Sequence, residues 1–452
     1  MSASRRGRRP AAEALTLLDA LARAPAAAAL VAHALERPED RKALRLSCSQ
    51  LRDAADEATT KMRLVLPDAA SARLLTAAPQ RWPCLRELSI FGADLAVFEA
   101  LGSGTWAALR TLGISLHDGA VLDVPSARAL AAALQRMPAL RALELWRIPF
   151  TDASAAELFR TSDADGAPHL RMLSINVGYG NSATALSLAA VRMLAASGWR
   201  LEELRLRMKD GAAAAGVAAL IAAPTFVLRR LRLSECGLDA ASLLSLADAP
   251  WPLEELGLSG NDFSAAAAGP ALAALSRLAG LRRLDVGHCN LTVATFAALV
   301  GAVWPMLTHL SAPTAFETRA VPTGVLGTDA CTLGPDAFAA VPALEFLDLS
   351  HVPLGEAAAQ LLASRRWACL QELNLYGAFE GGAGVAALAR GEWPVLRRLN
   401  LCGGGGPPLT REPARRWAPA LAEASERRAP APRCASVETD SDSDASEGED
   451  SE

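Results

Sequence analysis

The sequence predicts an α/β solenoid, a curved row of repeats with parallel strands on one face and helices on the other. Three observations lead to this prediction. A short leucine phrase recurs twelve times in the 452-residue chain, apolar and polar residues alternate inside each copy, and alanine- and leucine-rich runs at helical spacing, such as residues 127–137, follow the phrase. A single copy cannot bury its own apolar face, so neighbouring copies must stack and share one core.

The clearest copy is residues 251–263, which read WPLEELGLSGNDF. Leu256 and Leu258 alternate with polar residues, so both leucines of this predicted strand point to the same face. Most copies start 25–31 residues apart, which leaves room for one strand and one helix. The first leucines of the copies are Leu85, Leu109, Leu140, Leu170, Leu201, Leu228, Leu253, Leu281, Leu307, Leu344, Leu370 and Leu396.

Over about residues 80–405 this phrase resembles the leucine-rich repeats of ribonuclease-inhibitor-like proteins. The resemblance implies a horseshoe with strands on the concave face and helices on the convex face. It also implies a binding scaffold, and says little about what the scaffold binds. We assign residues 65–405 to this solenoid.

Two further positions support the repeat. The third residue after the last strand leucine is Asn261, Cys236 or Cys289 in three copies, small side chains that can hydrogen-bond the turn backbone. Large flat side chains precede the phrase, where we expect them to pack between repeats. These are seven of the nine tryptophans: Trp82, Trp106, Trp199, Trp251, Trp304, Trp367 and Trp393.

The chain begins with a basic segment, residues 1–10, which we expect to be disordered, and continues with a non-repeating block, residues 11–64, that reads as helices. Inside this block, DRKALRLSCSQLRDAAD resembles the second half of an F-box, although the usual leucine-proline opening of that family is replaced by an alanine-rich segment. The resemblance implies docking to the Skp-type linker of an SCF ubiquitin ligase. The alternative is a helical cap that shields the first repeat. The residues implied to dock are Leu44, Leu46, Cys48 and Leu51.

The second, fourth and sixth residues after each anchor leucine should face the concave side and form three ladders across the strands. Charges of opposite sign alternate along the first ladder and compensate one another. The second ladder places Arg205 beside Arg232, with Arg207 close by. Like charges opposite each other are unfavourable, so we predict a basic patch for an acidic or phosphorylated partner. The alternative is that Glu203 and Glu235 neutralise these arginines.

Aromatic side chains on the same face are candidate contacts for a protein partner. The positions fall toward the two ends of the repeat array, away from the arginines. For Trp146, packing under a neighbouring loop is the alternative. The candidates are Phe91, Trp146, Phe346 and Tyr376.

The C-terminal part changes character. We expect residues 406–430 to contain a capping helix and residues 431–452 to be a disordered acidic tail, since the last seventeen residues carry eight acids and no base. Within the repeats, residues 312–335 lack periodicity and predict a projecting loop. Candidates for phosphorylation, each with an acid three residues later, are Thr439, Ser441 and Ser446.

Composition and motif content exclude several compartments and classes of function. The eight cysteines are scattered without a C-x-x-C pair, which favours a reducing compartment: the cytoplasm, with the nucleus or a ciliary axoneme as alternatives. No apolar run has the length of a membrane span, and the weak charge of the chain without its tail does not favour nucleic acid. We find no phosphate-binding loop, metal-spaced cluster or catalytic signature, and predict a monomer that is not an enzyme and needs no cofactor.

Three function classes follow. The first is a protein-interaction module that selects substrates for an SCF ubiquitin ligase. The second is a scaffold without a ligase, cytosolic or bound to the cytoskeleton. The third is a GTPase activator, because a leucine-rich solenoid with an acidic tail resembles the Ran GTPase-activating proteins; no catalytic arginine of that family maps onto this sequence.

Overall fold

The computed structural model describes residues 59–66, 72–117, 119–160, 169–175, 185–209, 211–313, 337–379 and 382–401. They form two compact units, within residues 1–281 and 282–452. The F-box-like residues, most of the predicted loop, the C-terminal capping segment, the acidic tail and the phosphorylation candidates lie outside the described residues. The twelve predicted copies correspond to twelve strands.

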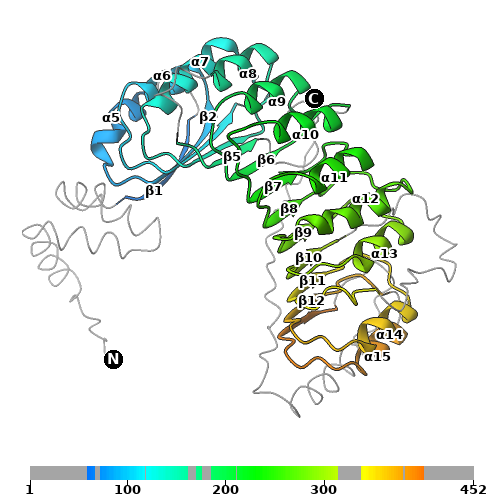
Figure 1. Cartoon of the computed structure of the whole chain (residues 1–452). Helices are drawn as coiled ribbons and strands as arrows, with labels where there is room; N and C mark the ends of the chain where they lie inside the picture. The colour runs from blue at the N-terminus through cyan, green and yellow to red at the C-terminus, as the bar shows by residue number, and fades with distance from the viewer. Residues whose placement is uncertain are drawn as a thin grey trace, which may run out of the picture. The chain divides into compact units, whose positions relative to one another are not determined.

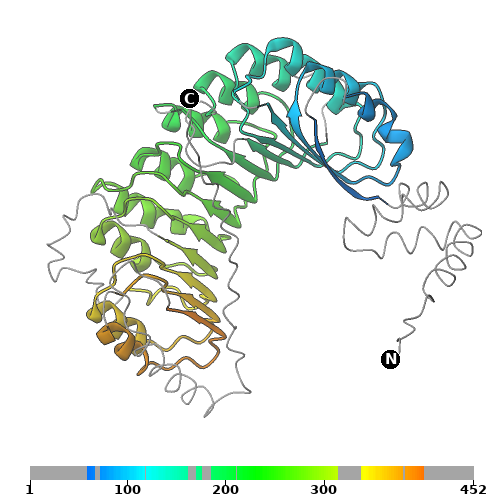
Figure 2. The same cartoon turned by 180° about the vertical axis from the view of Figure 1, so that it is seen from behind.

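In the first unit, eight strands lie side by side in chain order, and each of the paired neighbours is parallel (Figures 1 and 2). Their leucines align across the sheet, so that Leu143, Leu173, Leu204, Leu231 and Leu256 form one row of partners. The strands are β1 (Lys61–Val65), β2 (Glu87–Ala93), β3 (Thr111–Leu116), β4 (Ala142–Trp146), β5 (Met172–Ile175), β6 (Glu203–Leu206), β7 (Arg230–Leu233) and β8 (Glu255–Gly257).

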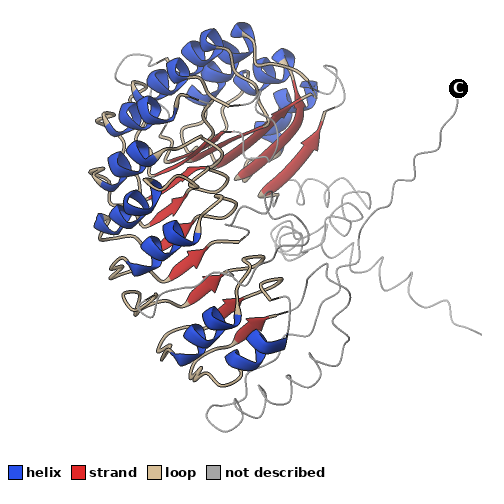
Figure 3. Ribbon diagram, turned by 90° about the vertical axis from the view of Figure 1, so that its right-hand side faces the viewer, coloured by secondary structure: helices blue, strands red, loops and turns tan. Residues whose placement is uncertain are grey.

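Helices connect successive strands of this unit and cover one face of its sheet (Figure 3). Several begin at a side chain that accepts a backbone N–H of the first turn, as Asp94, Asp123, Thr151, Ser187 and Asp239 do. Each helix packs against the next. The helices are α5 (Arg73–Arg81), α6 (Leu95–Gly102), α7 (Val124–Gln135), α8 (Asp152–Phe159), α9 (Leu188–Ala195), α10 (Ala213–Ile221), α11 (Ala240–Ala247) and α12 (Ala268–Ala274), followed by the 3₁₀ turn η3 (Leu275–Arg277).

The second unit repeats the same pattern. Its strands are parallel, and Leu284, Leu310, Leu347, Leu373 and Leu399 align as the first row of leucines does. The elements are β9 (Arg283–Asp285), α13 (Val293–Gly301), β10 (His309–Ser311), β11 (Phe346–Asp348), α14 (Glu356–Ser364), β12 (Glu372–Asn374), α15 (Gly382–Leu388) and β13 (Arg398–Asn400). The predicted fold, a leucine-rich-repeat solenoid with strands on one face and helices on the other, is thus confirmed within each unit.

The first strand corrects one prediction. Residues up to 64 were expected to be helical, but Lys61–Val65 form β1 and pair with β2. Met62 and Leu64 align with Leu88 and Ile90, the strand positions of the leucine phrase. The copy escapes recognition because Thr59 stands where the other copies have their anchor leucine.

The tryptophans before the phrase pack as predicted. Six of the seven are buried, and Trp393 is half-buried. Four of them donate the indole N–H to the carbonyl five residues earlier, as Trp106 does to Leu101 at 3.0 Å. Each such bond holds a helix end against the next strand, because that carbonyl has no partner inside its own helix.

We expect Trp106→Phe to be more destabilising than Trp82→Phe. Both substitutions remove the same atoms from a buried corner of the first unit. The Trp106 substitution also leaves the Leu101 carbonyl unpaired, whereas the buried indole N–H of Trp82 has no hydrogen-bond partner among the described residues. The free energy of unfolding, measured by urea titration, should differ between the variants by about 1 kcal/mol. Equal losses would show that the bond contributes nothing.

The turns after the strands are also built as predicted. Asn261 is buried; its side-chain oxygen accepts the backbone N–H groups of Cys236 and Leu238, and its amide nitrogen donates to the carbonyls of Leu233 and Leu258. One repeat earlier, the Cys236 thiol accepts the N–H of Met208. Burial raises the pKa of this thiol to about 12, so it stays protonated at neutral pH.

Candidate functional site

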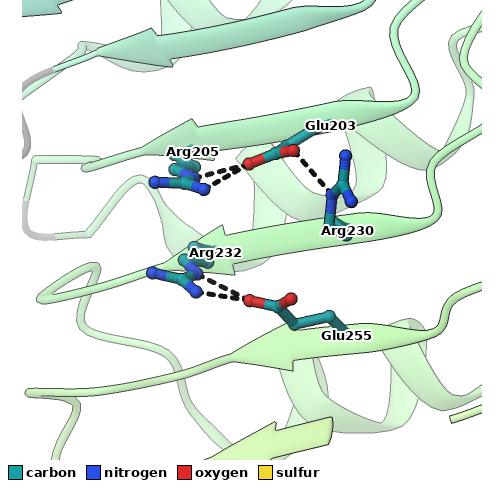
Figure 4. A network of polar contacts seen from close by, with 5 residues as sticks. All are labelled: Glu203, Arg205, Arg230, Arg232 and Glu255. Carbon is teal, nitrogen blue, oxygen red and sulfur yellow. Dashed lines mark hydrogen bonds and ion pairs between the residues drawn. The ribbon is translucent and has the colours of Figure 1, made fainter. Parts of the chain in front are cut away.

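The face of the first unit's sheet that the helices do not cover is here called the strand face. Side chains that alternate with the buried leucines stand on it, and a group of charged side chains belongs to β6, β7 and β8. The register places Glu203 beside Arg230 and Arg205 beside Arg232, as the ladders predict. These residues and Glu255 form the charge network drawn in Figure 4.

Glu203 lies at the centre of the charge network. One of its carboxylate oxygens accepts Nε and Nη2 of Arg205, at 2.7 and 2.5 Å, and the other accepts Nε of Arg230 at 2.6 Å. The Glu203 side chain is only 7% exposed, whereas those of Arg205 and Arg230 are 31% and 55% exposed. A buried carboxylate therefore fixes two guanidinium groups that remain open to solvent.

The other arginines are paired as well. Arg232 donates Nε and Nη2 to one oxygen of Glu255, and Arg207 forms an ion pair with Glu235. The alternative prediction was that Glu203 and Glu235 neutralise the arginines. It is correct for Arg205, which pairs with Glu203, and for Arg207, which pairs with Glu235. The partner of Arg232, Glu255, was not predicted. The idea of an uncompensated basic patch is therefore wrong.

The pairing leaves one nitrogen of each central guanidinium unused. Arg205 and Arg232 use Nε and Nη2 for their glutamates, and the structure gives their Nη1 groups no partner among the described residues. In Figure 4 the two guanidiniums lie next to each other, with nitrogen atoms turned away from the carboxylates. Gly257 makes room for this arrangement, since a Cβ there would lie 2.9 Å from Cγ of Arg232.

An aromatic pair stands on β2 and β4 of the same face. The rings of Phe91 and Trp146 are stacked, with centroids 5.2 Å apart and planes at 18°. The Arg63 guanidinium lies 4.4 Å from the centre of the Phe91 ring. Trp146 also covers Gly113 of β3, because the indole occupies the position of a Cβ at this glycine.

The sequence singled out Phe91 and Trp146 separately and missed their contact. Both are the sixth residue after an anchor leucine, two strands apart, and the register joins them through Ser115. Only small residues of β3, Gly113 and Ser115, lie between them, so the rings can meet above that strand. This spacing is the signal that could have predicted the pair.

Phe346 and Tyr376 belong to the second unit. Phe346 stacks on His309, its register partner, with ring centroids 5.6 Å apart. Tyr376 meets His351 edge-on at 5.0 Å and is 38% exposed. Each therefore forms a small aromatic contact of its own.

The described residues offer little for chemistry. No group of three or more potential ligands for a metal ion is found among them, and the four cysteines they include form no disulfide bond. Within the same residues, every helix is too short or too polar to span a bilayer. What the strand face presents is fixed guanidiniums and stacked rings, groups that bind a partner through charge and contact area.

Comparisons by sequence found no matching family model and no matching curated protein. By structure, the chain resembles a chain from the crystal structure of the Rad7 and Elc1 complex in yeast, with a TM-score of 0.42 and 16% sequence identity. The match covers 80% of this chain and 93% of that chain. The repeat fold is established by the strand register and helix packing described above, and the neighbour adds no information on function.

Proposed function

We propose that this chain is a protein-binding module that holds its partner on the strand face of the first unit. The observation that supports the proposal is the charge network. Glutamates fix the side chains of Arg205, Arg230 and Arg232. These side chains nevertheless stay 31–55% exposed, and they have no role in the core. Ordered, exposed arginines with rigid aromatic neighbours are typical of protein-binding surfaces.

We further propose that the module selects substrates for an SCF-type ubiquitin ligase. Support comes from the F-box-like stretch that ends shortly before β1, in which the resemblance implies that Leu44, Leu46, Cys48 and Leu51 dock. In this arrangement residues 11–58 bind the Skp-type linker and the strand face binds the substrate, in the cytoplasm or nucleus. The other reading of the same stretch is a cap of the solenoid, which makes the chain a scaffold.

The test is a pull-down from cell lysate with the tagged full chain, probed for the linker and the cullin of the ligase. Matched variants separate docking from folding. Leu44→Asp with Leu51→Asp alters the docking side and leaves the repeats untouched, whereas a chain lacking residues 1–58 keeps β1 intact. Capture of both ligase subunits by the full chain, lost in both variants, is the expected result. No capture by the correctly folded full chain would refute the ligase proposal and leave the scaffold.

A further inference from the structure

The strand face carries enough detail to define the chemistry of its partner. We infer that Arg205 and Arg232 bind one carboxylate side chain of an extended partner segment, and that the Phe91–Trp146 pair binds an apolar side chain of the same segment four or five residues away. This inference rests on the proposed function, because it presumes a protein partner on the strand face.

The two arginines are arranged as a receptor for an anion. They are register partners on adjacent strands, about 4.8 Å apart, a placement in which like charges repel. Glu203 accepts Nε and Nη2 of Arg205, and Glu255 accepts the same two nitrogens of Arg232. The Nη1 groups of both arginines have no partner among the described residues. A carboxylate that accepts from both Nη1 groups adds two charge-assisted hydrogen bonds and removes the repulsion.

The charge of the network selects a carboxylate over a phosphate. In the charge network, the guanidiniums of Arg205, Arg230 and Arg232 face the carboxylates of Glu203 and Glu255, so its net charge is +1, and the separate Arg207–Glu235 pair adds none. One aspartate or glutamate of a partner balances this charge. A phosphate brings close to two negative charges and would be repelled by Glu203 and Glu255.

The aromatic pair supplies the second contact. Phe91 is held between Arg63 and Trp146, and Trp146 rests on Gly113, so both rings are fixed before a partner arrives. Trp146 lies on β4, two and three strands from the two arginines and two residues further along the strand than their row, which corresponds to about 12–16 Å. An extended chain covers this distance in four or five residues at about 3.3–3.6 Å each.

The experiment uses purified full-length protein and labelled synthetic peptides of twelve residues. Each peptide contains one Phe and one Glu, in either order, one to six positions apart in an alanine and serine background. Fluorescence anisotropy should give the tightest Kd when Glu is four or five positions from Phe. Replacing that Glu by Gln should weaken binding by about tenfold or more, since two charge-assisted bonds are lost. Equal affinity for Glu and Gln peptides would overturn the inference.

Protein variants locate the two contacts. Arg205→Gln with Arg232→Gln should abolish the preference for Glu over Gln. Arg171→Gln with Arg229→Gln, which changes the charge equally and breaks two exposed ion pairs with Glu202 and Glu254, should preserve it. Gly113→Ala should displace Trp146 and abolish the preference for Phe over Ala, with the preference for Glu retained. Thermal unfolding curves show which variants are folded; loss of the Glu preference in the folded control pair would refute the site.

Two outcomes separate this inference from the proposed function. A phosphoserine peptide that binds more tightly than the Glu peptide would refute the carboxylate assignment. The full chain and the folded double variant Arg205→Gln, Arg232→Gln can be compared for capture of the same partner. If the variant still binds it, the proposed carboxylate site is wrong and the proposal of a protein-binding module is retained. If the full chain captures no partner and the Glu peptide still binds with the predicted spacing, the receptor stands and the ligase proposal fails.

Discussion

Replacing Asn261 by alanine should lower the free energy of unfolding of the first unit by about 3 kcal/mol, because four hydrogen bonds disappear from a buried turn. The side chain is 1% exposed and bonds to four backbone groups. Alanine removes all four of these bonds from a buried turn, and water can replace them only if the turn opens. Urea unfolding followed by circular dichroism measures the loss.

Two neighbours serve as controls for Asn261. Asp262→Ala removes an exposed side chain that caps only the N–H of Ser264, and should change stability by less than about 0.5 kcal/mol. Cys236→Ala removes the same repeat position one copy earlier, where a thiol makes weaker bonds, and should cost about 1 kcal/mol. If Asn261→Ala is as mild as Asp262→Ala, the turn does not depend on this side chain.

The fold could be predicted because the same pattern of side chains recurs in successive repeats. The leucines of the phrase occupy the buried rows, the tryptophans fill the corners, and Asn261 holds its turn, each as its residue type requires. The exception is β1, where Thr59 replaces the anchor leucine. The strand was not recognised because this one position lacks its usual leucine. The apolar spacing of the preceding residues still matched a helix, so the predicted helix was extended through the strand.

The candidate site could be predicted only in part. The period of the strand gave the ladders and hence the pair Arg205 and Arg232, and the register confirms their placement. The sequence did not reveal in which direction long side chains lean. Arg232 lies over Gly257 toward Glu255, and Trp146 lies over Gly113. A glycine on the strand face is the signal for such leaning, since it opens space for a neighbour's side chain.

We expect Glu203→Ala to destabilise the first unit by about 2 kcal/mol, the largest effect of any charged residue on the strand face. The substitution removes the brace of Arg205 and Arg230 and leaves neighbouring guanidiniums to repel one another. The loss is smaller than for a fully buried pair because both arginines are partly exposed. It should shrink in 1 M NaCl, where the Debye length falls to about 3 Å and the repulsion is screened.

Glu202→Ala is the matched control for Glu203→Ala, since Glu202 is the adjacent residue in the chain and pairs with Arg171 at 2.6 Å in an exposed position. Its loss should be within about 0.5 kcal/mol, so salt can change it by no more than that small amount. The same two variants distinguish fixed geometry from net charge in peptide binding. If the guanidiniums must be held in place, Glu203→Ala weakens the Glu peptide although it makes the network more positive. A tighter complex would mean that charge alone attracts the partner and that the glutamates do not position the arginines.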